Sequence, residues 1–170
     1  SVYANIKSLE NMSITNRDSG KNLLFAVLAD LPESDSGIND ADIRLMGCAA
    51  EKIKKLNKTD DRFYFFVRRR SFNKSSGKYM GRERKRGAIL NFVKYLSGEN
   101  SEIICLAGNE EKVRGASYII ALDSDTKIYA GEARELVGAA LHPLNTPVVD
   151  RAAGCVVKGA GIIQPKISVG

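Results

Sequence analysis

An apolar run that leads directly into two aspartates constrains this chain most. Residues 118–122 (Tyr-Ile-Ile-Ala-Leu) show no alternation, which is typical of a strand buried on both faces of a parallel sheet. In an extended backbone Asp123 and Asp125 share one side of the strand, and ligands of open α/β sheets bind at the carboxyl ends of strands. Because carboxylate oxygens suit Mg²⁺ or Mn²⁺, the sequence predicts a metal site at Asp123 and Asp125. On its own, such a pair is also what a solvated turn after a strand contains.

Length and composition indicate one folded domain over residues 1–170. The chain is 44% hydrophobic, which allows one sizeable core, and 27% charged, which excludes disordered and membrane-spanning compositions. It lacks an initiator Met, so we expect part of a larger protein that is soluble as this fragment. Cys48, Cys105 and Cys155 are too far apart for a zinc motif or a disulfide framework, which favours a reducing compartment.

The net charge of +6 is concentrated in two clusters, residues 68–70 (Arg-Arg-Arg) and 82–86 (Arg-Glu-Arg-Lys-Arg). Basic clusters of this kind favour anionic partners such as nucleic acid, acidic lipid or a nucleotide diphosphate. Charge alone does not choose among these partners, and a solvated basic face explains the same pattern.

The expected elements alternate between helix and strand. Apolar spacing predicts helices over residues 2–12, 39–57, 81–96 and 133–141, and strands over residues 22–29 (closed by Asp30), 63–67, 118–122, 156–157 and 162–163. The polar composition of residues 68–78 and 97–114 predicts a long loop and an exposed connection. This alternation predicts an α/β domain with a mainly parallel sheet whose first strand precedes this chain.

Six blocks in order resemble the cyclic β-1,2-glucan synthases, whose transferase segment forms glycosyltransferase family 84. The blocks are residues 16–18 with 24–30, 68–70, 80–81 with 83–87, 122–126, 142–145 and 161–165. Two departures from the family pattern are Arg82, where an aromatic is expected, and Ser124, where a small apolar residue is expected.

The resemblance implies a Rossmann-like, GT-A type nucleotide-sugar transferase core. Its activity would be metal-dependent transfer of glucose from UDP-glucose to a growing β-1,2-glucan. In this family Asp123 and Asp125 would hold Mg²⁺ or Mn²⁺, Asp30 would meet the uridine, and Lys85 and Arg86 would lie beside the diphosphate. The catalytic base and the acceptor-binding motif are expected outside this chain.

The resemblance also implies a cellular setting. The full enzyme would act on the cytoplasmic side of a bacterial inner membrane and would contact the membrane through parts outside this chain. No nucleic-acid partner is expected.

Two other functions compete with this interpretation. Haloacid dehalogenase phosphatases also place an Asp-X-Asp after an apolar strand, but they require Thr or Val where this chain has Lys127. A non-catalytic module could bind nucleic acid or an anionic membrane through the basic clusters. Single-strand binders, however, interleave aromatic and basic residues, whereas residues 63–66 (Phe-Tyr-Phe-Phe) precede the arginines as one block.

Overall fold

The computed structural model describes residues 2–165 of the chain. In chain order the helices are α1 (Val2–Thr15), a 3₁₀ segment η1 (Arg17–Asn22), α2 (Asp40–Leu56), α3 (Arg84–Leu96), α4 (Glu110–Arg114) and α5 (Glu132–Leu141). The strands are β1 (Phe25–Asp30), β2 (Phe63–Arg68), β3 (Ser71–Asn73), β4 (Lys78–Met80), β5 (Ile103–Ala107), β6 (Val148–Asp150) and β7 (Cys155–Lys158).

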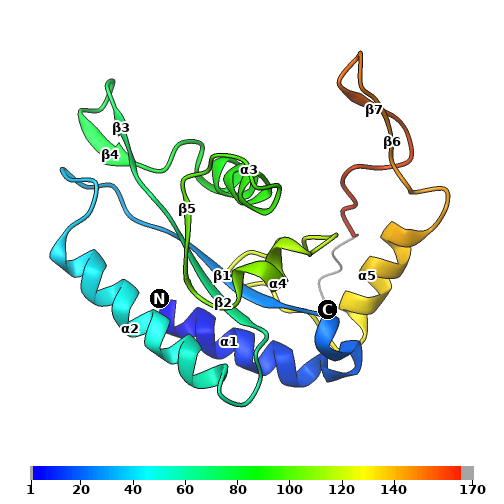
Figure 1. The fold of residues 1–170 in the computed structure, drawn as a ribbon, viewed down its shortest axis with the longest axis horizontal. Coiled ribbons are helices and arrows are strands. Elements are labelled where there is room, and N and C mark those ends of the chain that lie inside the picture. Colours follow the sequence, from blue (N-terminus) through cyan, green and yellow to red (C-terminus); the bar gives the residue numbers. More distant parts are fainter. Residues whose placement is uncertain (1, 166–170) are drawn as a thin grey trace.

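The main sheet contains three strands in the order β1-β2-β5, and helices pack on both of its faces (Figure 1). One core cluster joins α1 and α2 to the sheet through Ile6, Leu9, Ile53, Phe63 and Phe65, among others. A second cluster on the opposite face joins α3 and α4 to it through Tyr64, Phe66, Tyr95 and Val113. Every residue of β2 is buried, as expected for a central strand covered from both sides.

Local sequence accounts for the ends of α2. Asn39 accepts a hydrogen bond from the Asp42 backbone N–H, and the Asp42 carboxylate accepts one from the Asn39 backbone N–H, which forms a capping box. The predicted helix over residues 39–57 is therefore confirmed. Strands at residues 22–29 and 63–67 and helices at the start of the chain and over residues 133–141 are also confirmed, with shifts of a few residues.

The sheet is mixed, so the prediction of a mainly parallel sheet was wrong. β1 and β2 are parallel, but β2 and β5 are antiparallel. The Arg69 N–H donates to the Glu102 carbonyl at 2.8 Å, so the chain enters β5 beside the carboxyl end of β2 and must run back along it. A mixed α/β fold is what the structure shows, and the Rossmann-like GT-A core stays a prediction.

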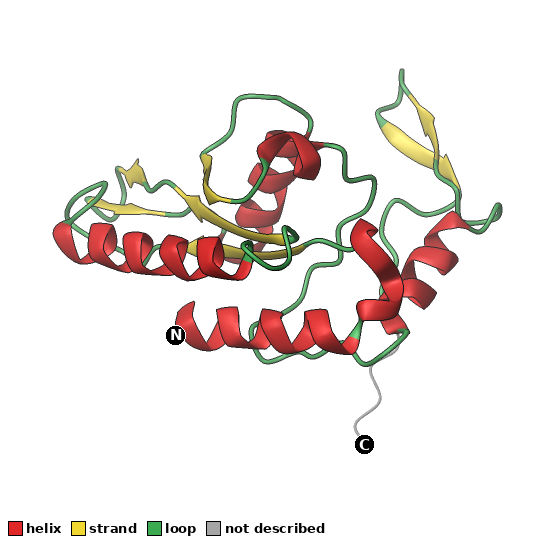
Figure 2. Cartoon of the chain, turned by 60° about the horizontal axis from the view of Figure 1, so that its bottom comes forward, coloured by secondary structure: helices red, strands yellow, loops and turns green. Residues whose placement is uncertain are grey.

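Two regions predicted as loops contain regular structure. Within residues 68–78 the chain starts a hairpin of β3 and β4, whose Phe72 and Tyr79 rings lie 5.2 Å apart between centroids. Residues 97–114 are not an exposed connection, because they form β5 and α4. In the last part of the chain β7 is confirmed and pairs with β6, whereas residues 162–163 form no strand. Figure 2 shows the hairpin of β6 and β7, together with α5, set apart from the main sheet.

The predicted strand at residues 118–122 is absent. An extended segment becomes a strand only when its backbone groups pair with a neighbour, and no pairing with this segment is found among residues 2–165. Ile120 and Leu122 instead face β1 across a cavity of about 250 Å³ that residues 25–28 also line. Tyr118 and Ile119 are 47% and 43% exposed.

Candidate functional site

The carboxyl ends of β1 and β2 are joined by an ion pair between Asp30 and Arg68. These residues are register partners in the parallel ladder, so the backbone already places them side by side. Arg68 Nε donates to Asp30 Oδ1 at 3.0 Å, and Arg68 Nη2 donates to Asp30 Oδ2. The Arg68 side chain is fully buried, whereas 36% of the Asp30 side chain is exposed. Asp30 therefore presents a fixed carboxylate to solvent at this edge of the sheet.

Arg68 also holds the segment that leads into α3. Its Nη1 donates to the Arg82 carbonyl at 2.8 Å, and its Nη2 donates to the Arg84 carbonyl at 3.2 Å. Glu83 and Arg84 have φ angles of 56° and 43°, so the backbone turns sharply at the points that Arg68 binds. One guanidinium thus joins β1, β2 and the start of α3.

Two glycines make this close approach possible. A Cβ at Gly81 would lie 2.1 Å from Arg68 Nη2, and a Cβ at Gly87 would lie 2.0 Å from the Arg82 carbonyl oxygen. No side chain fits at either position unless the segment moves. Gly81 and Gly87 therefore act as packing residues for the Arg68 guanidinium, a role that the sequence pattern alone did not reveal.

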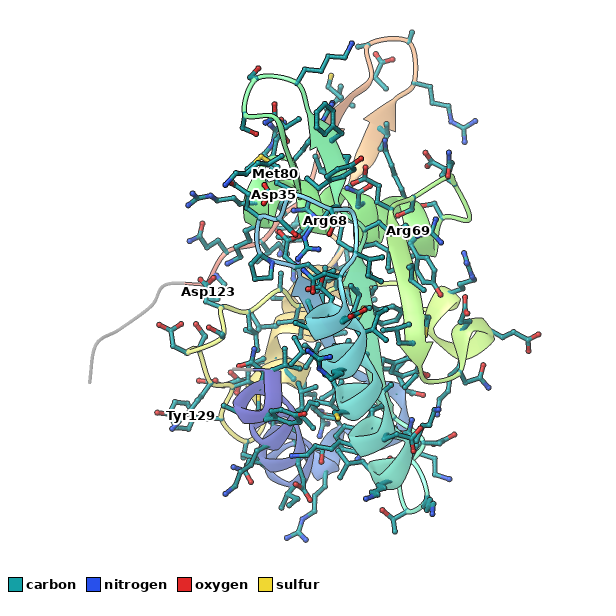
Figure 3. All side chains as sticks on the ribbon, turned by 90° about the vertical axis from the view of Figure 1, so that its left-hand side faces the viewer. Asp35, Arg68, Arg69, Met80, Asp123 and Tyr129 are labelled. Atoms are coloured by element: carbon teal, nitrogen blue, oxygen red, sulfur yellow. The ribbon has the colours of Figure 1, made fainter. Side chains whose placement is uncertain are left out.

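The start of α3 brings Lys85 to Asp123. Lys85 Nζ donates to Asp123 Oδ1 at 2.6 Å, and both side chains are more than half exposed, at 54% and 63%. Lys85 follows Arg84, whose carbonyl Arg68 binds, so the pair of Lys85 and Asp123 lies at the segment that Arg68 ties to Asp30. Figure 3 labels Arg68 and Asp123. Arg86 instead pairs with Glu83 on its own helix, at 3.2 Å and 75% exposed.

Asp123 and Asp125 belong to a turn rather than to the end of a strand. The Thr126 N–H donates to the Asp123 carbonyl at 3.0 Å, which closes the turn. The prediction that both carboxylates share one side of an extended strand was therefore wrong. Both residues are exposed, and their carboxylates are the oxygen ligands that Mg²⁺ takes. Within residues 2–165 no group of three or more His, Cys, Asp and Glu side chains gathers, so other ligands would have to complete a metal shell.

The first basic cluster, residues 68–70, is largely structural. Arg70 is buried and donates to both Asp42 carboxylate oxygens, at 2.6 and 3.0 Å, and these hydrogen bonds lower the pKa of Asp42 against the opposing effect of its burial. Arg68 is bound to Asp30, so only Arg69 of the three is exposed. A polyanion could therefore reach only Arg69 in this cluster, whereas every basic residue of the second cluster, residues 82–86, is exposed.

Comparison with known proteins identifies the relatives of the chain. No protein-family model matches it. Over 151 residues it is 33% identical to the cyclic β-(1,2)-glucan synthase NdvB of Rhizobium meliloti strain 1021, a match that covers 86% of this chain. The chain is related to a segment of the cyclic β-1,2-glucan synthases. It spans only 5% of the length of NdvB.

The relationship to the synthases agrees with the residue blocks found in the sequence. Blocks at residues 24–30, 68–70 and 80–87 contain Asp30, Arg68, Gly81 and Gly87, which the structure joins in one cluster. Within the described part of the chain, no helix has both the length and the apolar character needed to span a membrane. In the sequence Arg68 stands out only as one of three adjacent basic residues. Its close approach to Gly81 and Gly87 can be recognised only in three dimensions.

Proposed function

We propose that this chain forms the donor-binding part of a glucosyltransferase that transfers glucose from UDP-glucose to a β-1,2-glucan. Its relationship to NdvB supports a glycosyltransferase-like role in β-glucan synthesis. The observation that carries the proposal is the ion pair between Lys85 and Asp123, which lie 38 residues apart. It places a cation and a carboxylate at the segment that Arg68 ties to Asp30.

Each residue of the cluster has a task in donor binding. Asp30 keeps one face of its carboxylate accessible and can accept a hydrogen bond from the nucleoside, while Arg68 fixes its orientation. Lys85 is exposed and can exchange Asp123 for a phosphate oxygen, since charged hydrogen bonds to phosphate are among the stronger ones. Arg86 is held by Glu83 and contributes positive charge nearby rather than a direct contact.

When Lys85 binds a phosphate oxygen in place of Asp123, the Asp123 carboxylate becomes available to bind a metal ion. Asp123 and Asp125 would hold Mg²⁺ or Mn²⁺, and when bound the ion would neutralise charge on the donor diphosphate. Two carboxylates supply only part of an octahedral shell, so the donor must provide further oxygens. Release of Asp123 from Lys85 would then accompany binding of both ligands, which makes metal and donor binding cooperative.

Calorimetry of UDP-glucose with this chain, in Mn²⁺ and in chelator, tests the proposal. Donor binding should be tighter with Mn²⁺, and Asp123→Asn and Asp125→Asn should remove the difference. Glu10→Gln is the control: it removes an exposed carboxylate of α1, and the difference in donor affinity between Mn²⁺ and chelator should remain. Equal affinity in Mn²⁺ and chelator, or a metal effect that survives both aspartate variants, would show that this pair is not the metal site.

A further inference from the structure

A groove lined mainly by polar and charged residues lies beside the candidate site and has no role in it. It occupies about 470 Å³ between the exposed side of α3 and the chain that leads into β5. Its walls include Arg69, Arg82, Asn91, Asn100 and Glu102. The volume is within the range of about 300–1,000 Å³ that is typical of small-ligand pockets.

The groove offers hydrogen-bonding groups that the protein does not use. Within residues 2–165 the side chains of Arg69 and Arg82 make no ion pair or hydrogen bond, and the same holds for the Asn100 amide. Asn91 Nδ2 donates to the Gly87 carbonyl at 3.1 Å, which fixes the amide and leaves its Oδ1 as an acceptor. Glu102 receives only a long contact from the same Nδ2, at 3.5 Å.

The groove is lined by both hydrogen-bond donors and acceptors, which fits a polyhydroxyl ligand. Each sugar hydroxyl can accept from a guanidinium and donate to a carboxylate or amide oxygen at the same time. The lining mixes cationic side chains (Arg69, Arg82, Lys94) with carboxylates (Glu83, Glu102), and this mixture suits a neutral ligand that both donates and accepts better than a phosphate, which mainly accepts. Leu90 is 47% exposed on the wall and supplies apolar surface for the C–H face of a sugar ring.

The position of the groove connects it to the donor cluster. Gly87 lines the groove, and a Cβ there would lie 2.8 Å from Arg68 Nη1. Arg82 also lines the groove, and its carbonyl accepts a hydrogen bond from Arg68. The buried Arg68 guanidinium therefore stands between the groove and Asp30, and a chain bound in the groove would run beside the donor cluster.

We propose that this groove binds a gluco-oligosaccharide, as a subsite for the glucan chain. The identity of the sugar rests on the proposed function, because a glucan is the polymer that the related synthase makes. The binding mode rests on the groove itself: Arg69 and Arg82 donate to hydroxyls, Asn100 and Glu102 accept from them, and Leu90 contacts the ring.

The test titrates this chain with a β-1,2-linked glucose tetrasaccharide, followed by calorimetry or by amide shifts in NMR spectra. Arg69→Gln and Asn100→Ala should each weaken binding by about five- to tenfold, the effect of losing one polar contact of roughly 1–1.5 kcal/mol. Arg44→Gln and Asn11→Ala make the same changes on the exposed sides of α2 and α1 and should leave affinity unchanged. Thermal unfolding of all four variants checks that the fold is retained.

The outcomes separate this inference from the proposed function. No tetrasaccharide binding, or binding that both groove variants leave unchanged, overturns the groove as a saccharide subsite. Binding of inorganic pyrophosphate that requires Arg69, without tetrasaccharide binding, also overturns it and identifies an anion site. UDP-glucose is titrated in parallel: donor binding without tetrasaccharide binding refutes the groove alone, whereas groove-dependent saccharide binding without donor binding supports the groove and refutes the donor proposal.

Discussion

Asp30 and Arg68 are held together twice, by the register of two parallel strands and by the ion pair of their side chains. The strand pairing brings the two Cα atoms side by side, so the buried guanidinium needs no long flexible connection to reach its carboxylate. Its remaining N–H groups are then free to bind the carbonyls of Arg82 and Arg84. The position of α3, and with it the position of Lys85, therefore depends on an arginine in the sheet.

Gly87→Ala should destabilise the chain, although alanine is ordinarily the better helix former. The added methyl group would lie 2.0 Å from the Arg82 carbonyl oxygen and 2.8 Å from Arg68 Nη1, so the start of α3 must shift. Gly138→Ala in α5 is the matched control, because a Cβ there meets nothing within 4 Å, and it should stabilise by about 0.5–1 kcal/mol. Urea unfolding measures the change in the free energy of unfolding, which should fall in Gly87→Ala and rise in Gly138→Ala. A stabilising Gly87→Ala would contradict the packing role of Gly87.

Asp42→Asn should lower the free energy of unfolding by about 3–5 kcal/mol at neutral pH, because it leaves the buried Arg70 guanidinium without its counter-charge. The Arg70 hydrogen bonds lower the pKa of Asp42 in the folded state, so its contribution to stability is present above the ordinary carboxylate range and is lost as pH falls through the lowered pKa. The difference in the free energy of unfolding between wild type and Asp42→Asn should therefore become smaller at acidic pH.

Urea unfolding at pH 7 and pH 3 checks this dependence. Asp40→Asn is the control, since Asp40 is exposed in the first turn of the same helix, and it should cost less than about 1 kcal/mol. An Asp42→Asn difference that stays constant across this pH range would show that the carboxylate charge does not stabilise the fold.

Local patterns were enough to predict the elements that bury a regular apolar face. α1, α2 and α5 follow from helical spacing, and β2 follows from its aromatic run. β5 was missed because residues 103–107 form a short apolar stretch inside a polar region, and its direction is set by contact with the end of β2. Residues 118–122 were overpredicted because apolar character does not supply a pairing partner.

In the candidate site, the individual residues could be predicted from the sequence, but their contacts with one another could not. Asp30, Lys85 and Asp123 stand out in the sequence because each belongs to a recognisable block. Their meeting depends on contacts between residues 38 positions apart, both for Arg68 with Asp30 and for Lys85 with Asp123. Such contacts follow from how the elements pack, which no single window of sequence contains.

Thiol reactivity should distinguish the three cysteines. Burial is the main cause that raises the pKa of Cys105, and the nearby Glu110 charge adds to it, so little of this thiol is ionised near neutral pH. Cys48 and Cys155 are exposed. Cys105 is partly buried, so brief alkylation followed by mass spectrometry should label Cys48 and Cys155 first and Cys105 more slowly. Labelling of Cys105 in the folded chain as fast as Cys48 and Cys155 would contradict the raised pKa of its thiol.

The donor proposal makes Lys85 and Arg86 unequal, although they are neighbours of the same charge. Lys85 faces Asp123 across the site, whereas Arg86 is 75% exposed and pairs with Glu83 on its own helix. Lys85→Ala should weaken UDP-glucose binding by about tenfold, as expected for one charged hydrogen bond of roughly 1.5 kcal/mol, and Arg86→Ala should weaken it by less than about threefold. Calorimetry in Mn²⁺ measures both, and circular dichroism verifies that α3 persists. Equal losses in the two variants would mean that the donor responds to the general positive charge of the helix, and the Lys85–Asp123 contact would then have no specific part in binding.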